Sequence, residues 1–332
     1  MMKKWKERRV NIILGSFLGI LILLMLLATI CNHSKVSHDR LQKVEPDSVE
    51  KLADGGSVVE LTIDKSVKKC TTVAFCTPHQ YVDVYVDGRD VYSLKETAGR
   101  WGHTTGHVWN FVLLPVNTTH LTVKLSPCYP ETANALLTYY VGNGCEIYTG
   151  LMRQSLPTFI ISFIILIVGI YMLGYWLLVC KSEDVDATLL YLGLFSVILG
   201  LWAANETDFA KLLLVNQHAT TFAAYILLLA MPIPFVLFVR SFLDFDDKNI
   251  WRVFCGFSMV MCVISCVLHF TGIWELRQSL ILTHIVIVGL LIYLMRAIVF
   301  KFVKRQVGRR LRTCIAALIL VILASIADLI NY

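Results

Sequence analysis

The sequence predicts a membrane protein in which an α-helical transmembrane bundle carries an extracytoplasmic antiparallel β-sandwich. The chain of 332 residues is 56% hydrophobic, and its mean hydropathy is +0.65. It contains seven apolar stretches, each close to the length of about 20 residues that a helix needs to cross a hydrocarbon core of about 30 Å. Mostly polar residues, 32–156, separate the first stretch from the other six. This pattern excludes a soluble globular fold.

The predicted bundle consists of one N-terminal helix plus six. The first helix has a basic start and a long apolar core, so it is either a cleaved signal peptide or an uncleaved signal anchor. We favour the anchor, because residues 28–31 form a poor cleavage site. The predicted spans are residues 10–31, 157–180, 187–204, 219–239, 253–270, 279–300 and 313–332.

Basic residues in the short loops predict the orientation, because Lys and Arg are retained on the cytoplasmic side. With the basic segment 1–9 inside, the loops after the second, fourth and sixth spans are cytoplasmic. They hold ten Lys and Arg, whereas the opposite short loops hold two. We therefore expect a multi-pass plasma-membrane protein with a cytoplasmic N-terminus and with residues 32–156 outside. Membrane lipids are predicted partners of the basic loop 296–312, and nucleic acid is not.

The outer region has the short alternating pattern of β-strands. Residues 81–86 alternate strictly before Asp87-Gly88, a dipeptide that favours a tight hairpin turn, and residues 89–92 form the return strand. Further strands are predicted at 57–63, 110–115, 120–125 and 135–140. These features predict an antiparallel β-sandwich. The predicted domains are a basic N-terminus (1–9), a signal anchor (10–31), a linker (32–50), the sandwich (51–152) and a six-helix membrane region (153–332).

Four of the ten cysteines lie in the predicted sandwich: Cys70, Cys76, Cys128 and Cys145. An even number outside the cytoplasm permits two disulfides in any of three pairings. Buried free thiols are the alternative. The cysteines in or beside the spans lack the spacing of a metal site. The His103-x-x-x-His107 pair could bind a metal on a helix, but the surrounding glycines argue against a helix there. No metal and no cofactor is predicted.

A glycine-rich loop in the sandwich concentrates side chains suited to ligand contact. Loops carry specificity, and aromatic faces stack on sugars. The expected ligand is a carbohydrate, another small molecule, or a periplasmic or surface protein; the alternative is a purely structural loop. The candidate residues are Arg100, Trp101, His103, His107 and Trp109.

A second group of candidates lies in the helical half. Asn205, Glu206 and Asp208 cluster at the outer end of one span, and Asp328 lies near the outer end of the last. A carboxylate in hydrocarbon is costly and usually meets a polar partner. These residues either form a polar patch that couples the sandwich to the bundle or belong to ordinary solvated ends.

Two prolines and two glycines complete the candidates in the helices. Pro232 and Pro234 interrupt the fourth span, as a hinge or as a fixed packing feature. Gly15 and Gly19 allow close helix approach in the first span, which predicts a homodimer.

Several runs of the sequence resemble a known family. Residues 84–92 and 108–115 are similar to the jelly-roll domains of bacterial membrane receptors and some glycosidases. The helical half adds residues 191–202, the run Met231-Pro232-Ile233-Pro234 and residues 327–332. Together they resemble bacterial seven-transmembrane receptors with diverse intracellular signalling modules, above all those that precede a GGDEF diguanylate cyclase domain. The resemblance implies the sensor half of such a receptor.

The chain departs from that family in one respect. Members generally have seven helices after the outer domain and a cytoplasmic output module, whereas six follow here, so we expect a truncation before a final helix and the output domain. No Gly-Gly-Asp/Glu-Glu-Phe sequence occurs in the 332 residues, and we expect no enzyme activity from this chain. The alternatives to a sensor are a transporter-like protein, which predicts repeated half-bundles, and an orphan membrane scaffold.

Overall fold

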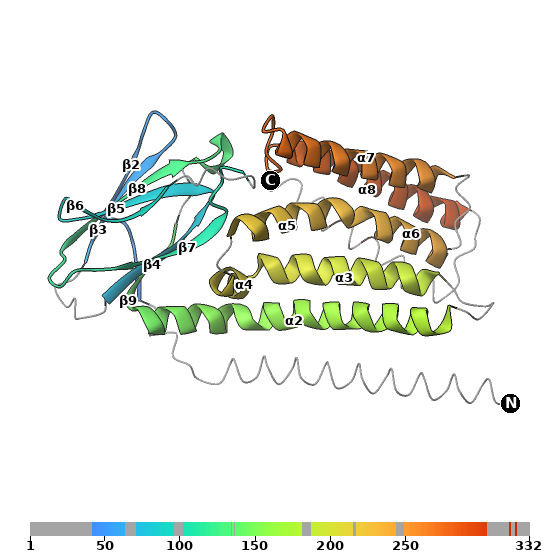
Figure 1. Cartoon of the computed structure of the whole chain (residues 1–332), viewed down its shortest axis with the longest axis horizontal. Coiled ribbons are helices and arrows are strands. Elements are labelled where there is room, and N and C mark those ends of the chain that lie inside the picture. The colour runs from blue at the N-terminus through green and yellow to red at the C-terminus, as the bar shows by residue number, and fades with distance from the viewer. Residues whose placement is uncertain are drawn as a thin grey trace. The chain divides into compact units, whose positions relative to one another are not determined.

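The computed structural model describes residues 42–63, 71–95, 102–133, 135, 137–180, 187–214, 217–243, 249–303, 319 and 323. The chain divides into two compact units. The sandwich unit comprises Met1–Gly99, His103–Ile164 and Ala203–Thr221. The helical unit comprises Arg100–Gly102, Ile165–Trp202 and Phe222–Tyr332. Figure 1 labels the elements along the chain.

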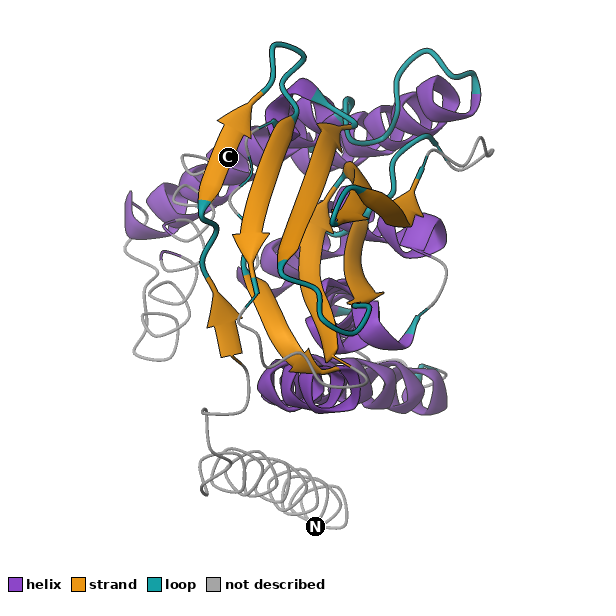
Figure 2. Ribbon diagram, turned by 90° about the vertical axis from the view of Figure 1, so that its left-hand side faces the viewer, coloured by secondary structure: helices purple, strands orange, loops and turns teal. Residues whose placement is uncertain are grey.

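The sandwich unit contains two antiparallel sheets (Figure 2). One has four strands in the order β1-β9-β4-β7, and the other has five in the order β2-β3-β8-β5-β6. The strands are β1 (Gln42–Val44), β2 (Ser48–Lys51), β3 (Ser57–Thr62), β4 (Thr71–Pro78), β5 (Gln80–Val86), β6 (Arg89–Leu94), β7 (His107–Leu113), β8 (His120–Pro127) and β9 (Tyr139–Asn143).

Alternating side chains of the two sheets form the core of the sandwich. In β5 every second residue is buried, as the period of two in a strand requires. Val73, Phe75, Val84 and Val123 are fully buried in this core. The predicted hairpin joins β5 to β6, and Asp87 (φ 48°) and Gly88 (φ 79°) both have the positive φ of a tight turn of this kind.

The strands differ from the sequence prediction in three places. β1 and β2 fall in the predicted linker 32–50, where they pair with β9 and β3. Both are largely exposed, so they lack the apolar alternation that marks a half-buried strand. β4 was not predicted as a strand. It is buried over four consecutive residues, so its sequence does not alternate either. β9 begins at Tyr139, four residues later than predicted.

The helices are α2 (Gly144–Val179), α3 (Thr188–Glu206), α4 (Asp208–Leu213), α5 (Gln217–Ala230), α6 (Pro232–Leu243), α7 (Ile250–Phe270) and α8 (Leu280–Val303). In the described part of the chain, five helical stretches are long and apolar enough to cross a membrane, with α5 and α6 counted as one. The predicted span 10–31 and nearly all of 313–332 lie outside the described residues. The fold class, an antiparallel β-sandwich with a bundle of membrane-spanning helices, is confirmed.

Two local features shape the helical unit: glycines where α2 and α3 meet, and a proline at the start of α6. A Cβ on Gly200 would lie 2.6 Å from the backbone nitrogen of Leu166, and one on Gly169 would lie 2.7 Å from that of Val197. Glycine therefore lets α2 and α3 pack backbone to backbone. α5 ends at Ala230 and α6 begins at Pro232, a position at which the missing N–H of proline costs no helical hydrogen bond.

Candidate functional site

The last strand of the sandwich runs directly into the first described helix. β9 ends at Asn143 and α2 begins at Gly144. The Oδ1 atom of Asn143 accepts a hydrogen bond from the Cys145 backbone N–H at 2.9 Å, which satisfies one of the unpaired donors of the first turn. A Cβ on Gly144 would lie 2.8 Å from Thr72 Oγ1. Glycine therefore allows the helix to begin close against β4.

An apolar layer fixes this start of α2 to the four-stranded sheet. Ile147 and Leu151, which are 0% and 3% exposed, lie on one helix face because they are four residues apart. They pack with Ala74 of β4 and Tyr140 of β9. Three partly buried residues surround this group: Trp109, Phe111 and Leu212. We call the set Ala74, Trp109, Tyr140, Ile147, Leu151, Asp208 and Leu212 the sandwich–helix junction.

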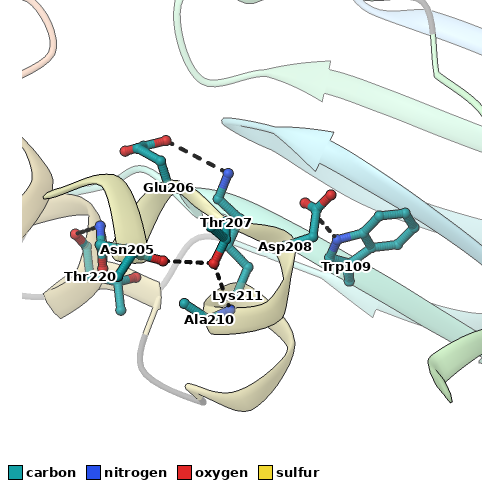
Figure 3. Close-up of polar contacts among 9 residues, drawn as sticks. Trp109, Asn205, Glu206, Thr207, Asp208, Ala210, Lys211 and Thr220 are labelled. Atoms are coloured by element: carbon teal, nitrogen blue, oxygen red, sulfur yellow. Dashed lines mark hydrogen bonds and ion pairs between the residues drawn. The ribbon is translucent and has the colours of Figure 1, made fainter. Parts of the chain in front are cut away.

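The short helix α4 contributes Asp208 and Leu212 to the junction, and its start is capped. Thr207 Oγ1 accepts a hydrogen bond from the Ala210 N–H at 3.3 Å and donates one to the Ala204 carbonyl at 2.7 Å (Figure 3). A threonine in this position satisfies a backbone donor at a helix N-terminus. Thr207 thereby holds the turn between α3 and α4.

Polar contacts of neighbouring residues support the same turn. Asn205 Nδ2 donates a hydrogen bond to the Thr220 carbonyl at 3.0 Å. Lys211 Nζ and Glu206 Oε2 form an ion pair at 3.7 Å (Figure 3). Glu206 is 42% exposed in its side chain, so this pair adds little stability.

Asp208 connects α4 to the sheet. Its Oδ1 atom accepts a hydrogen bond from Trp109 Nε1 at 3.2 Å (Figure 3). The negative charge in the first turn also complements the positive end of the helix. The Trp109 ring lies 6.2 Å from that of Tyr140 and 6.5 Å from that of Phe111. Trp109 thus belongs both to the aromatic layer and to the polar contact.

Burial shifts the pKa values of two groups in or beside the junction. Burial raises the pKa of the Cys76 thiol to about 12; the nearby Asp208 carboxylate adds to the rise, and Lys211 opposes it. Burial also raises the pKa of Tyr140, again with a smaller contribution from Asp208. The charge of Asp208 therefore acts on groups of two strands, β4 and β9.

Residues 103–107 of the predicted ligand loop pack on the sandwich, whereas Arg100 and Trp101 lie outside the described residues. Thr104 is buried, and its Oγ1 lies 2.6 Å from His79 Nδ1. The ring of His107, the first residue of β7, lies 5.0 Å from that of His79. The His103 carbonyl accepts a hydrogen bond from the Tyr81 hydroxyl at 2.9 Å. Ligand contact by this loop stays a prediction.

The remaining predicted residues are two prolines, the cysteines of the sandwich and Asp328. Pro232 and Pro234 are buried in the first turn of α6. Cys76 and Cys145 carry free thiols, and the half-buried Cys128 donates its backbone N–H to the His79 carbonyl. Cys70 and Asp328 lie outside the described residues, so disulfide pairing and a role for Asp328 stay predictions. Across the described ranges, no group of three or more potential ligands is placed to hold a metal ion.

Sequence reasoning missed most of the apolar half of the junction. Ile147 and Leu151 have the spacing of a helix face, but they precede the apolar span, so the segment was assigned to the end of the sandwich. The Thr207-Asp208 pair has the signature of a helix start, which could have identified α4. The contact between Trp109 and Asp208 had no sequence signal, because each residue belonged to a separate candidate group.

The comparison with protein families agrees with this architecture. A family model described as 7TM diverse intracellular signalling matches residues 150–332, which is more than half of the chain. No curated protein matches the sequence. The matched membrane domain is a sensor and signalling domain and is not itself catalytic. The chain belongs to the 7TM diverse intracellular signalling family.

Proposed function

We propose that this membrane sensor transmits a change in its β-sandwich to the bundle through the sandwich–helix junction. The observation that carries the proposal is the direct continuation of β9 into α2, with Ile147 and Leu151 buried against the sheet. No loop intervenes to absorb a movement. A ligand or protein that shifts β4 or β9 would therefore move the start of α2 as well.

The length of α2 supports this role. Its 36 residues correspond to about 54 Å at 1.5 Å per residue, whereas a hydrocarbon core is about 30 Å thick. One helix is thus long enough to belong to the junction and also to cross a bilayer. The Trp109–Asp208 hydrogen bond adds a second connection, from β7 to α4. A transporter-like protein or a membrane scaffold would not need these contacts.

The proposal is tested at the far end of α2, where Cys180 is an exposed thiol. We would label Cys180 with an environment-sensitive fluorophore in the full chain in nanodiscs, in a background whose other nine cysteines are serine. Trp109→Phe and Asp208→Ala both remove the junction hydrogen bond. We expect both to shift the emission of the label in the same direction.

The matched control for this test is Asp83→Ala. Asp83 Oδ1 also accepts one side-chain hydrogen bond, from Ser93 at 2.6 Å, but this bond joins β5 and β6. The control should leave the emission of the Cys180 label unchanged. Folded junction variants with wild-type emission would contradict the proposal.

We further propose the orientation that the charge distribution favours, with the sandwich outside and the N-terminus inside. Cys145 and Cys180 lie near opposite ends of α2, and both are exposed. A membrane-impermeant maleimide should label Cys145 in intact cells and Cys180 only after permeabilisation. Labelling in the reverse order would contradict the proposed orientation without affecting the junction.

The output we propose is control of a diguanylate cyclase that lies outside these 332 residues, in a further segment or a partner protein, as the resemblance to receptors preceding GGDEF domains implies. Expression of the full chain in its own cells should change the cyclic dinucleotide concentration, and the Asp208→Ala variant should change it less. A concentration that is independent of the chain would rule out this output. The Cys180 measurement would still test the sensor mechanism.

A further inference from the structure

A shallow groove of about 460 Å³ lies where the strands β4 and β7 meet the first turns of α2. Its lining includes Phe111 and Leu113 of β7 together with Asn143, Cys145, Tyr148 and Thr149 at the start of α2. We infer that this groove is an effector site for a small, largely apolar molecule. The inference rests on the proposed function, because the groove borders the sandwich–helix junction.

The chemistry of the lining selects an apolar ligand. Several polar groups already have hydrogen-bond partners within the protein: Asn143 Oδ1 accepts from the Cys145 N–H, Thr149 Oγ1 donates to the Cys145 carbonyl at 2.8 Å, and the Tyr148 hydroxyl donates to the Leu212 carbonyl at 3.4 Å. What remains for a ligand is chiefly hydrocarbon and aromatic surface. A sugar or an inorganic ion would lose hydration there with little compensation.

Two rings and one exposed leucine provide that surface. The rings of Phe111 and Tyr148 lie 6.0 Å apart at an angle of 55°, and Leu113 is 65% exposed at the end of the edge strand β7. The volume is within the range of about 300–1,000 Å³ that is typical of small-molecule sites. An aromatic ring or a short hydrocarbon chain matches this combination of size and chemistry.

The groove also lies beyond the apolar part of α2. Thr149 precedes Pro157, where the predicted membrane span begins, by eight residues, or about 12 Å along the helix axis. On the predicted span, the apolar lining would face the aqueous layer and not lipid chains. Apolar surface exposed to water is unfavourable and marks interaction sites. A ligand that covers it would gain the hydrophobic contribution that the free protein lacks.

Occupancy of the groove would act directly on the junction. One wall belongs to β7 through Phe111 and Leu113, and the other belongs to α2 through Tyr148 and Thr149. A molecule in contact with both walls favours the arrangement of strand and helix in which both contacts are made. The inferred ligand therefore regulates the same connection that the proposed function assigns to signalling.

The test measures binding of N-phenyl-1-naphthylamine, an apolar fluorescent probe, to the full chain in nanodiscs, with empty nanodiscs subtracted. We expect saturable binding to one site. Leu113→Glu places a charge in the groove, and Thr149→Trp fills it; each should raise the Kd of the probe at least tenfold. Val116→Glu is the matched control, because Val116 is 57% exposed and does not line the groove. Its Kd should stay within twofold of wild type.

A second readout uses the exposed Cys145 at the groove. Bound probe should slow alkylation of Cys145 at least threefold, as followed by mass spectrometry of the peptide. Decanoate and naphthalene as competitors separate a lipid-like chain from an aromatic ligand, and displacement by either supports the inference.

Absence of saturable binding, or equal weakening by Val116→Glu, would overturn the inferred site. In that case the response of the Cys180 label to Trp109→Phe, which needs no probe, would still support the proposed function. Normal groove binding with an unresponsive Cys180 label would instead overturn the proposed function alone.

Discussion

The indole Nε1 of Trp109 donates a hydrogen bond to Asp208 Oδ1 at 3.2 Å, across 99 positions of the sequence. A hydrogen bond to a charged acceptor contributes about 1.5–3 kcal/mol when buried, and we expect about 1 kcal/mol here because Asp208 is partly exposed. In a double-mutant cycle, Trp109→Phe and Asp208→Ala should therefore show a coupling energy of that size in thermal unfolding of the sandwich. Asp208→Asn keeps an acceptor and should cost less than Asp208→Ala. Strictly additive effects would show that the contact contributes nothing.

The cap of α4 is expected to hold Asp208 in place. Thr207→Ala removes the side-chain oxygen that accepts from the Ala210 N–H and should destabilise the helix start by about 1 kcal/mol. Because α4 has six residues, this loss should speed hydrogen exchange throughout residues 208–213. Thr207→Ser retains the hydroxyl and serves as the control. Equal exchange in the alanine and serine variants would contradict a capping role.

The contact between α2 and α3 should be intolerant of any side chain at Gly200. In Gly200→Ala, a Cβ would lie 2.6 Å from Leu166 N and 2.8 Å from Leu166 Cα, and backbone atoms cannot move aside as a flexible side chain would. We expect a loss of about 1–3 kcal/mol from overpacking, measured as a lower unfolding temperature in nanodiscs. Gly174→Ala in α2 is the control, because no atom lies within 4 Å of its Cβ position. Similar unfolding temperatures for the two variants would contradict close packing at Gly200.

Cys76, which pairs with Trp109 across β4 and β7 beside the junction, should be almost unreactive in the folded protein. With a pKa of about 12, on the order of 10⁻⁴ of this thiol is ionised at pH 8, and the thiolate is the reactive species. Iodoacetamide should therefore modify the exposed Cys145 well before Cys76. Asp208→Ala should increase the reactivity of Cys76 only modestly unless the junction opens, because burial is the main cause of its shift. Rapid modification of Cys76 in the wild-type protein would show that its thiol is not buried as described.

The same shift predicts how stability depends on pH. The folded-state pKa of about 12 lies above the ordinary value of 9.0, so the protonated thiol favours the folded state. This contribution is complete below pH 9 and is lost between pH 9 and 12, with a slope of about 1.4 kcal/mol per pH unit. The free energy of unfolding of Cys76→Ala, measured with denaturant between pH 9 and 12, should lack this part of the dependence on pH. Parallel pH profiles for the wild type and the variant would show that Cys76 does not contribute.

The membrane-spanning stretches and the central strands could be predicted because their patterns are local. Apolar length alone identified all five spans of the described region. Strict alternation and the Asp87-Gly88 dipeptide identified the hairpin of β5 and β6. β1 and β2 could not be found in this way, because they are mostly exposed and are held chiefly by pairing with β9 and β3.

The junction was predictable only in part, because it depends on contacts between distant segments. The charge cluster around Asp208 was recognised as a possible coupling patch, and Trp109 was recognised as a candidate contact residue. Their mutual hydrogen bond follows from the register of β7 against β4 and from the capped turn before α4. The early start of α2 had no hydropathy signal, because residues 144–156 form a helix that extends beyond the apolar span.

In the proposed mechanism, α2 would transmit movement from one of its ends to the other as a rigid rod, because it is one continuous helix of 36 residues. Over about 54 Å, a tilt of about 5° at the Gly144 end, with that end as the pivot, displaces the Val179 end by about 5 Å, comparable to the pitch of one helical turn. A small rearrangement at the sandwich would leave its buried side chains in contact. At the Val179 end of α2, the same rearrangement would produce a displacement large enough to repack the end of the helix. Under the proposed function, the sensitivity of the receptor would be set by the stiffness of this one helix, and Pro157, the proline within it, would be the position at which that stiffness can be tuned.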